Sequence, residues 1–401
     1  MRYSFGDVIV DTDRFLVECA GEHLQLQPQV FDVLVHLIEH RDRVVSKEEL
    51  LDAVWGDQFV SESALTTRIK EARRAVGDDG ATQAVIRTVH GRGYQFVPDV
   101  DAREPGTTDG TAGGWTAPPV EQQIRFCTTG DGVRLAYATV GEGPPLVRAA
   151  HWLTHVDDDW NSPIWRHWLT DLARGRMLVR YDERGCGLSD QDPAEITFDS
   201  FVDDLEAVVD DLGLERFPLL GISQGGPVAV EYIRRHPERV SKLVLVGAYT
   251  QGAMVRARTE EARREREVQL EMIRIGWGRE DPSFRLFFTS TFIPDAPPHL
   301  WDEFARLLRR TTSAESAARI IGATDVADVT ETAKHIDVPT LILHARGDMR
   351  VSFDEARKWA ALIPGSRLVP LDTSNHLMRP DEPSWARLIE EIDRFLAEPE
   401  E

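Results

Sequence analysis

Apolar side chains in the first hundred residues recur with two different periods. They alternate with polar side chains through residues 3–17, which is the pattern of half-buried β-strands. From Pro28 onward they recur every three or four residues, as on one face of a helix: Val30, Phe31, Leu34, Leu37 and Ile38. The run Ser46-Lys-Glu-Glu49 has the form of a capping box and predicts a second short helix that ends near Trp55.

A third helix is predicted over about 61–76, and two β runs over 86–97 predict a hairpin. One side of this helix is an apolar stripe that can pack inward: Leu65, Ile69, Ala72 and Val76. The other side carries hydroxyls and long cations, which suit a helix that enters the major groove of DNA: Ser63, Thr66, Thr67, Lys70, Arg73 and Arg74. Arg92 at the tip of the hairpin would reach an adjacent groove or phosphate. The alternative is a solvated basic face, and Glu71 within it favours that alternative.

The pattern changes after about residue 121. Short apolar runs now have the composition of buried strands, and helical segments lie between them: 145–150, 217–222, 338–345 and 367–371. Residues 249–332 interrupt this alternation with helical, charged and aromatic sequence. Between the two patterns, residues 101–120 are rich in Gly, Pro, Thr and Ala, which is typical of an interdomain linker.

Composition and charge narrow the classes of function. A chain of 401 residues is long enough for two or three domains, and its net charge of −22 argues against general, charge-driven affinity for nucleic acid or anionic membranes. Any DNA contact must therefore use a local basic patch. Cys19, Cys127 and Cys186 are odd in number and far apart, so we expect no disulfide framework, metal site or cofactor. Without a signal peptide or an apolar run of about 20 residues, the chain is expected to be cytoplasmic and to avoid membranes.

The most informative motif is Gly221-Ile-Ser223-Gln-Gly225, which follows the apolar run 217–222. A G-x-S-x-G pattern between a strand and a helix holds its serine in a strained turn, where only small residues fit on either side. The backbone N–H of Gln224 would then point to where an oxyanion forms. Ser223 is therefore a candidate nucleophile for acyl transfer. The alternative explanation of the same pattern is a Gly-rich turn in which the serine caps the helix.

Two partners follow in the order Ser, Asp, His. Asp348 comes directly after the strand-like run 338–345, and His376 comes after the run 367–371. A neutral imidazole can take the serine proton, and a buried carboxylate can hold the imidazole in the required tautomer. Taken alone, Asp348 could be a turn-forming residue, and His376 could be a structural histidine, since the chain has 12 histidines. A second oxyanion donor is expected after the strand 145–150, from the backbone N–H of Leu153 or Trp152, together with that of Gln224.

The order of elements in the first hundred residues resembles a known DNA-binding domain. Strands, a helix, a capped short helix, a basic helix and a hairpin ending in RTVHGRGYQFV are similar to the OmpR/PhoB-type winged-helix output domain of response regulators. The resemblance covers about 1–97 and implies binding to double-stranded promoter DNA. It also implies a homodimer, because such domains usually occupy paired half-sites. We see no receiver domain with a phosphoacceptor before this winged helix, so the usual input by phosphorylation is not expected.

Residues from about 124 to 396 resemble the α/β-hydrolase superfamily. The turn Asp182-Glu-Arg-Gly-Cys-Gly-Leu-Ser189 matches its D-x-R-G-x-G-x-S motif, and residues 223–246 match its nucleophile helix and following strand. The resemblance implies a mostly parallel sheet with helices on both faces, and a helical cap. One departure is His151-Trp152 where the superfamily commonly has His-Gly; His151 itself is interpreted as structural. The expected boundaries are a winged helix over 1–98, a flexible linker over 99–121, hydrolase core over 122–248 and 334–398, and a cap over 249–333.

The two resemblances together suggest a regulator. Similar hydrolase domains are fused to bacterial regulators and nucleotide cyclases, so the first hypothesis is a one-component transcription factor. In it, the hydrolase half senses, and hydrolyses or merely binds, a small apolar ester, lactone or related ligand. The cap and Trp152, Trp160, Trp165 and Trp168 would then line an aromatic cavity, unless these side chains simply pack in the core. The alternatives are an active serine esterase, lactonase or thioesterase with an accessory winged helix, and a scaffold that only dimerises.

Overall fold

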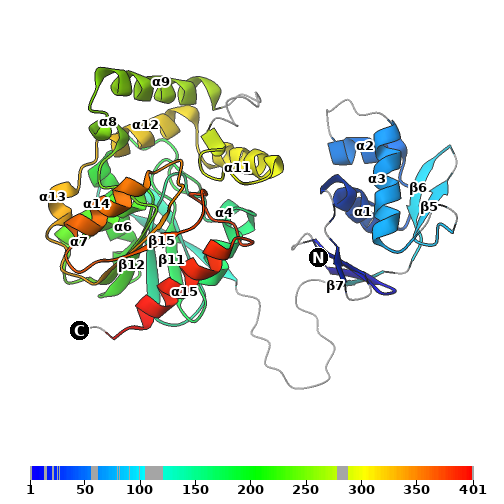
Figure 1. Ribbon diagram of the computed structural model, residues 1–401, viewed down its shortest axis with the longest axis horizontal. Helices are drawn as coiled ribbons and strands as arrows, with labels where there is room; N and C mark the ends of the chain where they lie inside the picture. Colours follow the sequence, from blue (N-terminus) through cyan, green and yellow to red (C-terminus); the bar gives the residue numbers. More distant parts are fainter. Residues whose placement is uncertain are drawn as a thin grey trace. The chain divides into compact units, whose positions relative to one another are not determined.

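The structure, a computed structural model, consists of two compact units. Residues 1–119 form the first unit and residues 120–401 form the second. The described residues are 2–12, 16–19, 22–24, 26, 28–55, 62–78, 80, 82–89, 91–98, 100–103, 121–277 and 288–399. Both units contain helices and sheets (Figure 1), and none of the described helices is long and apolar enough to cross a membrane.

The N-terminal unit packs three helices between an antiparallel sheet and a hairpin. The sheet has the order β4-β3-β2-β1-β7. Its strands are β1 (Arg2–Phe5), β2 (Val8–Asp11), β3 (Leu16–Cys19), β4 (Glu22–Leu24) and β7 (Asp101–Arg103). The remaining elements are α1 (Pro28–Glu39), α2 (Lys47–Trp55), α3 (Glu62–Ala75), β5 (Ile86–Val89) and β6 (Gly93–Phe96). The helices and the hairpin thus have the order expected from the sequence.

Side-chain chemistry explains where these elements begin and how they pack. The backbone N–H of Glu49 donates to the hydroxyl of Ser46 at 3.0 Å, as the capping box predicts for the start of α2. The apolar stripe of α3 is buried against α1, and Leu65 and Ile69 are at most 1% exposed. Backbone bonds between Val45 and Tyr94 attach the hairpin to the loop before α2.

The predicted linker of 99–121 begins too early. Strand β7 pairs with β1, with Arg2 opposite Arg103 and Ser4 opposite Asp101. A sheet edge needs only backbone donors and acceptors, so the polar composition of Asp101–Arg103 concealed a strand. Residues 104–120 lie outside the described part of the chain.

The C-terminal unit is built on an eight-stranded, mostly parallel sheet. Its order is β15-β14-β13-β12-β10-β11-β9-β8, and only the pairs β8/β9 and β9/β11 are antiparallel. The strands are β8 (Gln122–Thr128), β9 (Arg134–Val140), β10 (Pro145–Ala149), β11 (Met177–Tyr181), β12 (Phe217–Ile222), β13 (Val240–Val246), β14 (Thr340–Ala345) and β15 (Arg367–Leu371). The central strands β12, β13 and β14 are almost wholly buried, which accounts for their continuous apolar sequence.

Helices cover both faces of this sheet. They are α4 (Asp158–Asn161), α5 (Arg166–Leu172), α6 (Phe198–Asp211), α7 (Gly225–Arg235), α13 (Thr330–Ala333), α14 (Phe353–Leu362) and α15 (Pro383–Ala397). Because parallel crossovers are right-handed, α6, α7 and α14 lie on one face, and α5, whose crossover runs the opposite way along the sheet, lies on the other. Helix α15 joins α5 there, where the rings of Trp168 and Trp385 are 4.7 Å apart.

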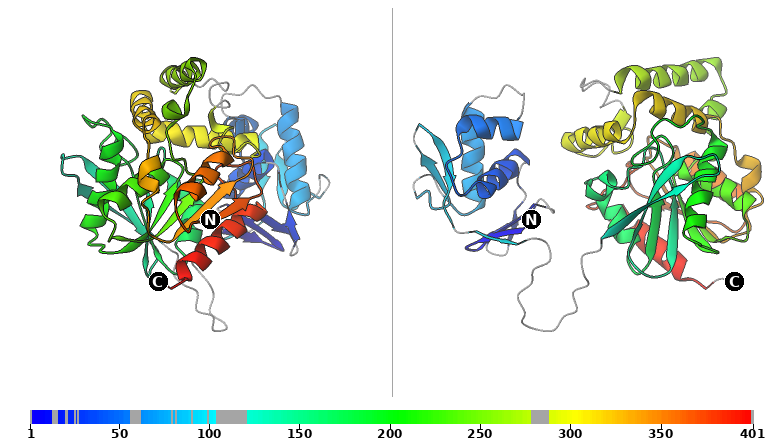
Figure 2. Two further views of the ribbon diagram at one scale, coloured as in Figure 1. Left: turned by 60° about the vertical axis from the view of Figure 1, so that its left-hand side comes forward. Right: turned by 180° about the vertical axis from the view of Figure 1, so that it is seen from behind.

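The expected cap is present as an insertion between β13 and β14. Its described helices are α8 (Ala253–Arg256), α9 (Glu260–Gly276), α11 (Pro298–Thr311) and α12 (Ala314–Asp325). They gather on one side of the sheet, with α9 lying along α12 (Figures 1 and 2). Residues 278–287, which include part of the aromatic run expected in the cap, lie outside the described residues.

Candidate active site and nucleic-acid interface

Ser223 lies at a sharp turn between β12 and α7. Its φ of +51° is in the left-handed region, which is strained for a residue with a side chain. The neighbouring glycines make the turn possible. A Cβ at Gly221 would lie 2.7 Å from the carbonyl oxygen of Gly225, and a Cβ at Gly226 would lie 2.4 Å from the Cβ of Ala248. The geometry is therefore that of the nucleophile turn that the sequence pattern predicts.

Asp348 and His376 form a buried pair beyond the ends of β14 and β15. Nδ1 of His376 lies 2.7 Å from Oδ2 of Asp348. The other carboxylate oxygen accepts the backbone N–H groups of Arg350 and Val351, both at 2.8 Å. Burial by itself would raise the pKa of Asp348, but the facing imidazole and these hydrogen bonds hold it below its usual value. Nε2 of His376 is buried and bonds to no described residue.

The end of strand β13 brings the serine and the histidine to one place. The backbone N–H of Ser223 donates to the carbonyl of Val246 at 2.9 Å. At the next residue, Gly247, a Cβ would lie 3.0 Å from Cε1 of His376 and 3.7 Å from Oδ2 of Asp348. Gly247 therefore leaves the space that the imidazole occupies, and all three predicted residues meet at this strand end.

The loop after β10 differs from the sequence expectation. Leu153 has a φ of +58°, and its backbone N–H donates to Oε1 of Glu183 at 3.1 Å. The side-chain amide of Gln224 donates to Oε2 of the same carboxyl group at 2.7 Å. The N–H of Leu153 is thus occupied by a protein acceptor, so its prediction as a free oxyanion donor is not supported. The backbone N–H groups of Gln224, directly after the serine, and of Trp152 remain the expected donors.

Glu183 is itself an unusual neighbour for such a site. It is 1% exposed, and burial raises the pKa of its carboxyl group well above the usual range. It occupies the second position of the D-x-R-G turn. The sequence showed that motif but gave no sign that this side chain reaches the oxyanion loop.

A cavity of about 250 Å³ opens beside Ser223 under the cap. One part of its wall is aromatic, with Trp152, Phe288 and Phe292 in mutual contact. Another part is polar and charged, and the described residues there include Arg256, Arg266, Asp325 and Arg350. The expected apolar cavity is therefore only half apolar.

Of the tryptophans considered from the sequence, only Trp152 lines this cavity among the described residues. Trp165 and Trp168 are buried in the core, 2% and 0% exposed. His151 stacks on Trp165 with ring centroids 4.2 Å apart, and burial lowers its pKa well below the usual value. This supports the structural role expected for His151.

The exposed face of α3 carries most of the residues expected at DNA. Thr66, Thr67, Lys70 and Arg74 are exposed, as is Arg92 in the hairpin turn. The side chain of Ser63 lies outside the described part of the helix.

Arg73 does not belong to that exposed face. Its guanidinium donates to the carbonyl of Ile86 at 2.9 and 2.6 Å and to the hydroxyl of Thr88 at 2.9 Å. It therefore anchors α3 to β5, which its position on the helix wheel could not reveal.

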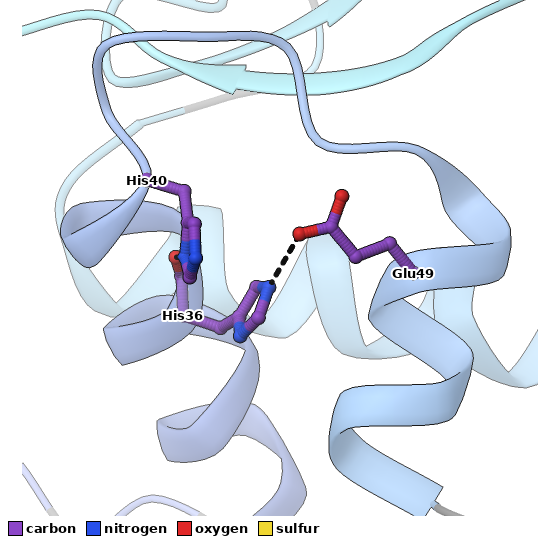
Figure 3. Close-up of side chains that lie close together, drawn as sticks. All are labelled: His36, His40 and Glu49. Atoms are coloured by element: carbon purple, nitrogen blue, oxygen red, sulfur yellow. Dashed lines mark hydrogen bonds and ion pairs between the residues drawn. The ribbon is translucent and has the colours of Figure 1, made fainter.

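A possible ligand cluster in the N-terminal unit was not expected from the sequence. His36 lies in α1, His40 in the turn directly after it and Glu49 in α2, with Nε2 of His36 3.2 Å from Oε1 of Glu49 (Figure 3). However, Arg43 donates to both oxygens of Glu49, at 2.8 and 2.6 Å, and this bond lowers the pKa of Glu49 to about 2. A metal ion would have to displace Arg43, so the cluster is best described as an ion-pair network.

Comparison with known proteins agrees with this division of the chain. The family described as "alpha/beta hydrolase fold" matches residues 153–383, and "Transcriptional regulatory protein, C terminal" matches residues 21–96. The AB hydrolase superfamily protein YisY of Bacillus subtilis is 28% identical over 63% of this chain and 91% of its own length. The bifunctional esterase/perhydrolase DCH of Acinetobacter calcoaceticus is 29% identical over 61% of this chain and 90% of its own.

The N-terminal unit has a separate relative. The transcriptional regulator HilA of Salmonella typhi is 37% identical over 24% of this chain and 17% of its own length. Among solved structures, an esterase from Exiguobacterium antarcticum is similar in fold, with a TM-score of 0.57 and 24% identity over 68% of this chain and 99% of its own. A bromoperoxidase from Bacillus anthracis is similar to the same degree, with a TM-score of 0.58 and 21% identity over 69% of this chain and 100% of its own.

Proposed function

This chain belongs to the α/β-hydrolase fold family, and from that premise we propose that it is a one-component transcription regulator that senses and cleaves an acyl ligand. Its N-terminal unit is an OmpR/PhoB-type regulatory domain, and its C-terminal unit has the hydrolase fold. The observation that carries the proposal is that a strained Ser223, which lines a cavity, and the His376–Asp348 pair lie at the same end of strand β13. In a chain with a DNA-binding domain, such a cavity is suited to detecting a signal.

In the proposed chemistry, the hydroxyl oxygen of Ser223 attacks the acyl carbon of the ligand. Nε2 of His376 takes the serine proton, while Asp348 at Nδ1 holds the required tautomer and stabilises the imidazolium. The backbone N–H of Gln224 at the start of α7 stabilises the oxyanion. His376 returns the proton to the leaving group, and a water then hydrolyses the acyl-enzyme by the same proton transfers in reverse. The relationship to an esterase/perhydrolase supports acyl transfer as the reaction class.

The regulatory half of the proposal concerns DNA. The exposed side chains of α3 and the hairpin are expected to contact double-stranded promoter DNA, with a homodimer on paired half-sites. Ligand binding can alter DNA affinity only if the ligand binds the DNA-competent and DNA-incompetent states differently. Cleavage of the ligand would then end the signal.

The His376–Asp348 hydrogen bond also favours a second candidate function. In it, the protein is an active serine esterase whose winged helix serves localisation or autoregulation. The two candidates differ in one property, because only the regulator changes its DNA affinity when the Ser223 cavity is occupied.

A fluorophosphonate probe tests the reactive site directly, since it phosphonylates activated serines. We expect one modified residue in the full chain, located at Ser223 by peptide mass spectrometry. Ser223→Ala should abolish labelling, and His376→Ala should slow it by at least about 10³-fold, because the serine then lacks its base. Ser366→Ala, which changes a serine in a surface turn, is the matched control and should label at the normal rate. Normal labelling of His376→Ala would contradict the assigned base.

A further inference from the structure

Arg350 places a positive charge in the wall of the Ser223 cavity. It lies two residues after Asp348, and its backbone N–H donates to Oδ1 of that residue at 2.8 Å. Its guanidinium carbon lies 5.0 Å from the ring centroid of Phe288 and 4.9 Å from that of Phe292. The guanidinium makes no hydrogen bond or ion pair with any residue that the structure describes. Five N–H donors are therefore held by aromatic packing beside the cavity.

The other charged residues that the structure describes in the cavity wall do not neutralise Arg350. Arg266 donates to both oxygens of Asp325, at 2.6 and 2.8 Å, so these two charges cancel each other. Arg256 donates to the backbone carbonyl of Gln251 at 2.7 Å and has no carboxylate partner among the described residues. The described wall thus carries three arginines and one aspartate, although the whole chain has a net charge of −22.

Buried arginines elsewhere in the unit are held in different ways. The guanidinium nitrogens of the fully buried Arg148 also have no hydrogen-bond partner among the described residues, but Arg148 is not among the residues that line the cavity. Other buried arginines have carboxylate partners. Arg184, for example, is fully buried and bonds to the carboxylates of Asp131 and Asp204. Arg350 is only partly buried, because it faces the cavity, and it has no acceptor among the described residues. A guanidinium removed from much of its water without an acceptor is costly, and an anionic ligand in the cavity would supply one. Burial, followed by the nearby Arg266, lowers the pKa of Arg350 to about 10, so this side chain is still charged at neutral pH. Burial also raises the pKa of the neighbouring Tyr249 to about 12, which keeps its phenol neutral and able to donate.

A single ring separates this cation from the reaction centre. Phe292 contacts the guanidinium of Arg350 and also the imidazole of His376, whose ring centroid is 5.6 Å away in an edge-to-face arrangement. Ser223 and Arg350 line the same cavity. One small molecule can therefore present an acyl carbon to Ser223 and a negative group to Arg350.

We propose that the ligand of this cavity is an acyl compound that carries a carboxylate at the end remote from its acyl carbon, and that Arg350 binds this carboxylate. The inference rests on the proposed function, because it takes Ser223 as the acyl site. It modifies the expectation from the sequence, which was a small apolar ester, lactone or related ligand. The aromatic wall contacts the chain between the two ends, and a bidentate guanidinium–carboxylate bond selects the charged end.

The test compares two esters of equal length in the full chain. Mono-4-nitrophenyl adipate carries the carboxylate, and methyl 4-nitrophenyl adipate is its neutral counterpart; the same pair is made for pimelate and suberate. We expect kcat/KM for the charged ester to exceed that for the neutral ester by about 10- to 100-fold for at least one chain length. Arg350→Gln should make kcat/KM equal for the two esters, and Arg350→Lys should retain part of the preference for the charged ester. Because the ratio is taken within one protein, a change in the folded fraction cancels.

Arg346→Gln is the matched control. Arg346 lies in the same loop but is exposed, with its Nε 3.4 Å from Asp372, and it is not among the residues that line the cavity. Its variant should keep the wild-type ratio. Turnover of both esters with equal kcat/KM at every chain length would overturn the carboxylate proposal and leave the hydrolase proposal intact.

A binding measurement distinguishes the carboxylate proposal from the hydrolase proposal if the wild type cleaves neither ester. Monomethyl adipate and dimethyl adipate are titrated into Ser223→Ala, which cannot form an acyl-enzyme. Preferential binding of the monoester, lost in Ser223→Ala/Arg350→Gln, would support the carboxylate site even if the wild type cleaved neither nitrophenyl ester. Absence of that preference, or of any binding, would overturn it.

Discussion

At the scale of single residues, backbone strain gathers around the candidate active site. Of the three described non-glycine residues with a positive φ, Ser223 and Leu153 lie there, and the third, Gln83, lies in the N-terminal unit. The sequence predicted the first, because glycines flank the serine and mark the close approaches of the turn. It could not predict the second, because Trp152 stands where the superfamily commonly has glycine, and the partner of Leu153 is Glu183 from a distant turn. Strain that depends on a long-range acceptor leaves no local pattern.

The site residues divide in the same way. Ser223, Asp348 and His376 could be proposed from the sequence because each follows a strand-like run, and the carboxyl ends of parallel strands meet at one edge of a sheet. Arg350 and Glu183 could not be proposed in this way, because their contacts are with side chains from separate segments. The structure supplied these contacts, including those of Phe288 and Phe292 with Arg350.

Gly247 gives a residue-scale prediction. Gly247→Ala would place a Cβ 3.0 Å from Cε1 of His376, so the imidazole must move by a few tenths of an ångström. We expect kcat/KM for 4-nitrophenyl esters to fall by about 10-fold, less than the cost of about 10²-fold for a misplacement of about 1 Å.

The control for this substitution is Gly365→Ala. Gly365 also has a positive φ, +71°, but its Cβ would meet nothing within 4 Å. Both variants should lose about 1–2 kcal/mol of unfolding free energy from the unfavourable φ, measured by chemical denaturation. Only Gly247→Ala should lose activity, and equal kcat/KM values for the two variants would contradict the packing of His376 against β13.

At the scale of elements, periodicity gave a good account of the winged helix. The three helices and the hairpin were predicted from apolar spacing, the capping box and the glycine turn, all of which are local signals. Strand β7 was assigned to the linker because its sequence is polar and its partner β1 is about a hundred residues away. Helix α3 shows the limit of a helix wheel, which orders side chains by direction but does not show which neighbouring element they meet.

Arg73 and Arg74 give a matched prediction on that helix. Arg73→Ala removes the hydrogen bonds that join α3 to β5 and leaves the buried carbonyl of Ile86 without this donor. We expect a loss of about 1–3 kcal/mol in the stability of the N-terminal unit, read as faster amide hydrogen exchange in β5 and β6 of the full chain.

Arg74→Ala should behave differently, because this side chain is exposed. Its effect on stability should stay within about 0.5 kcal/mol. DNA affinity should fall, and if Arg74 contacts a phosphate the salt dependence of binding should decrease by about one ion. If the Arg73→Ala variant exchanges the amide hydrogens of β5 and β6 at the same rate as the wild type, Arg73 has no anchoring role. If the Arg74→Ala variant binds DNA with unchanged affinity, Arg74 is not part of the DNA-binding surface.

At the scale of the whole molecule, the chain joins a regulatory DNA-binding unit to a hydrolase unit through a segment of low complexity. The net charge of −22 disfavours non-specific attraction to DNA, so we expect DNA affinity to come from the local basic face of α3 and the hairpin. In the proposed function, occupation of the Ser223 cavity by a ligand changes the affinity for DNA. The fold of each unit could be predicted from the sequence, but coupling between them could not, because it is a difference in free energy between two states.

The most direct test of the regulator proposal is the DNA affinity of the full chain before and after covalent occupation of Ser223. A duplex site is first obtained by selection from a random library, and its Kd is measured by fluorescence anisotropy at fixed salt. The same measurement follows complete modification by the fluorophosphonate, with Ser223→Ala treated identically as the control. We predict that modification changes Kd by at least about fivefold in the wild type and leaves Ser223→Ala unchanged. Equal Kd values for modified and unmodified wild type would contradict the regulator and favour an esterase with an accessory winged helix.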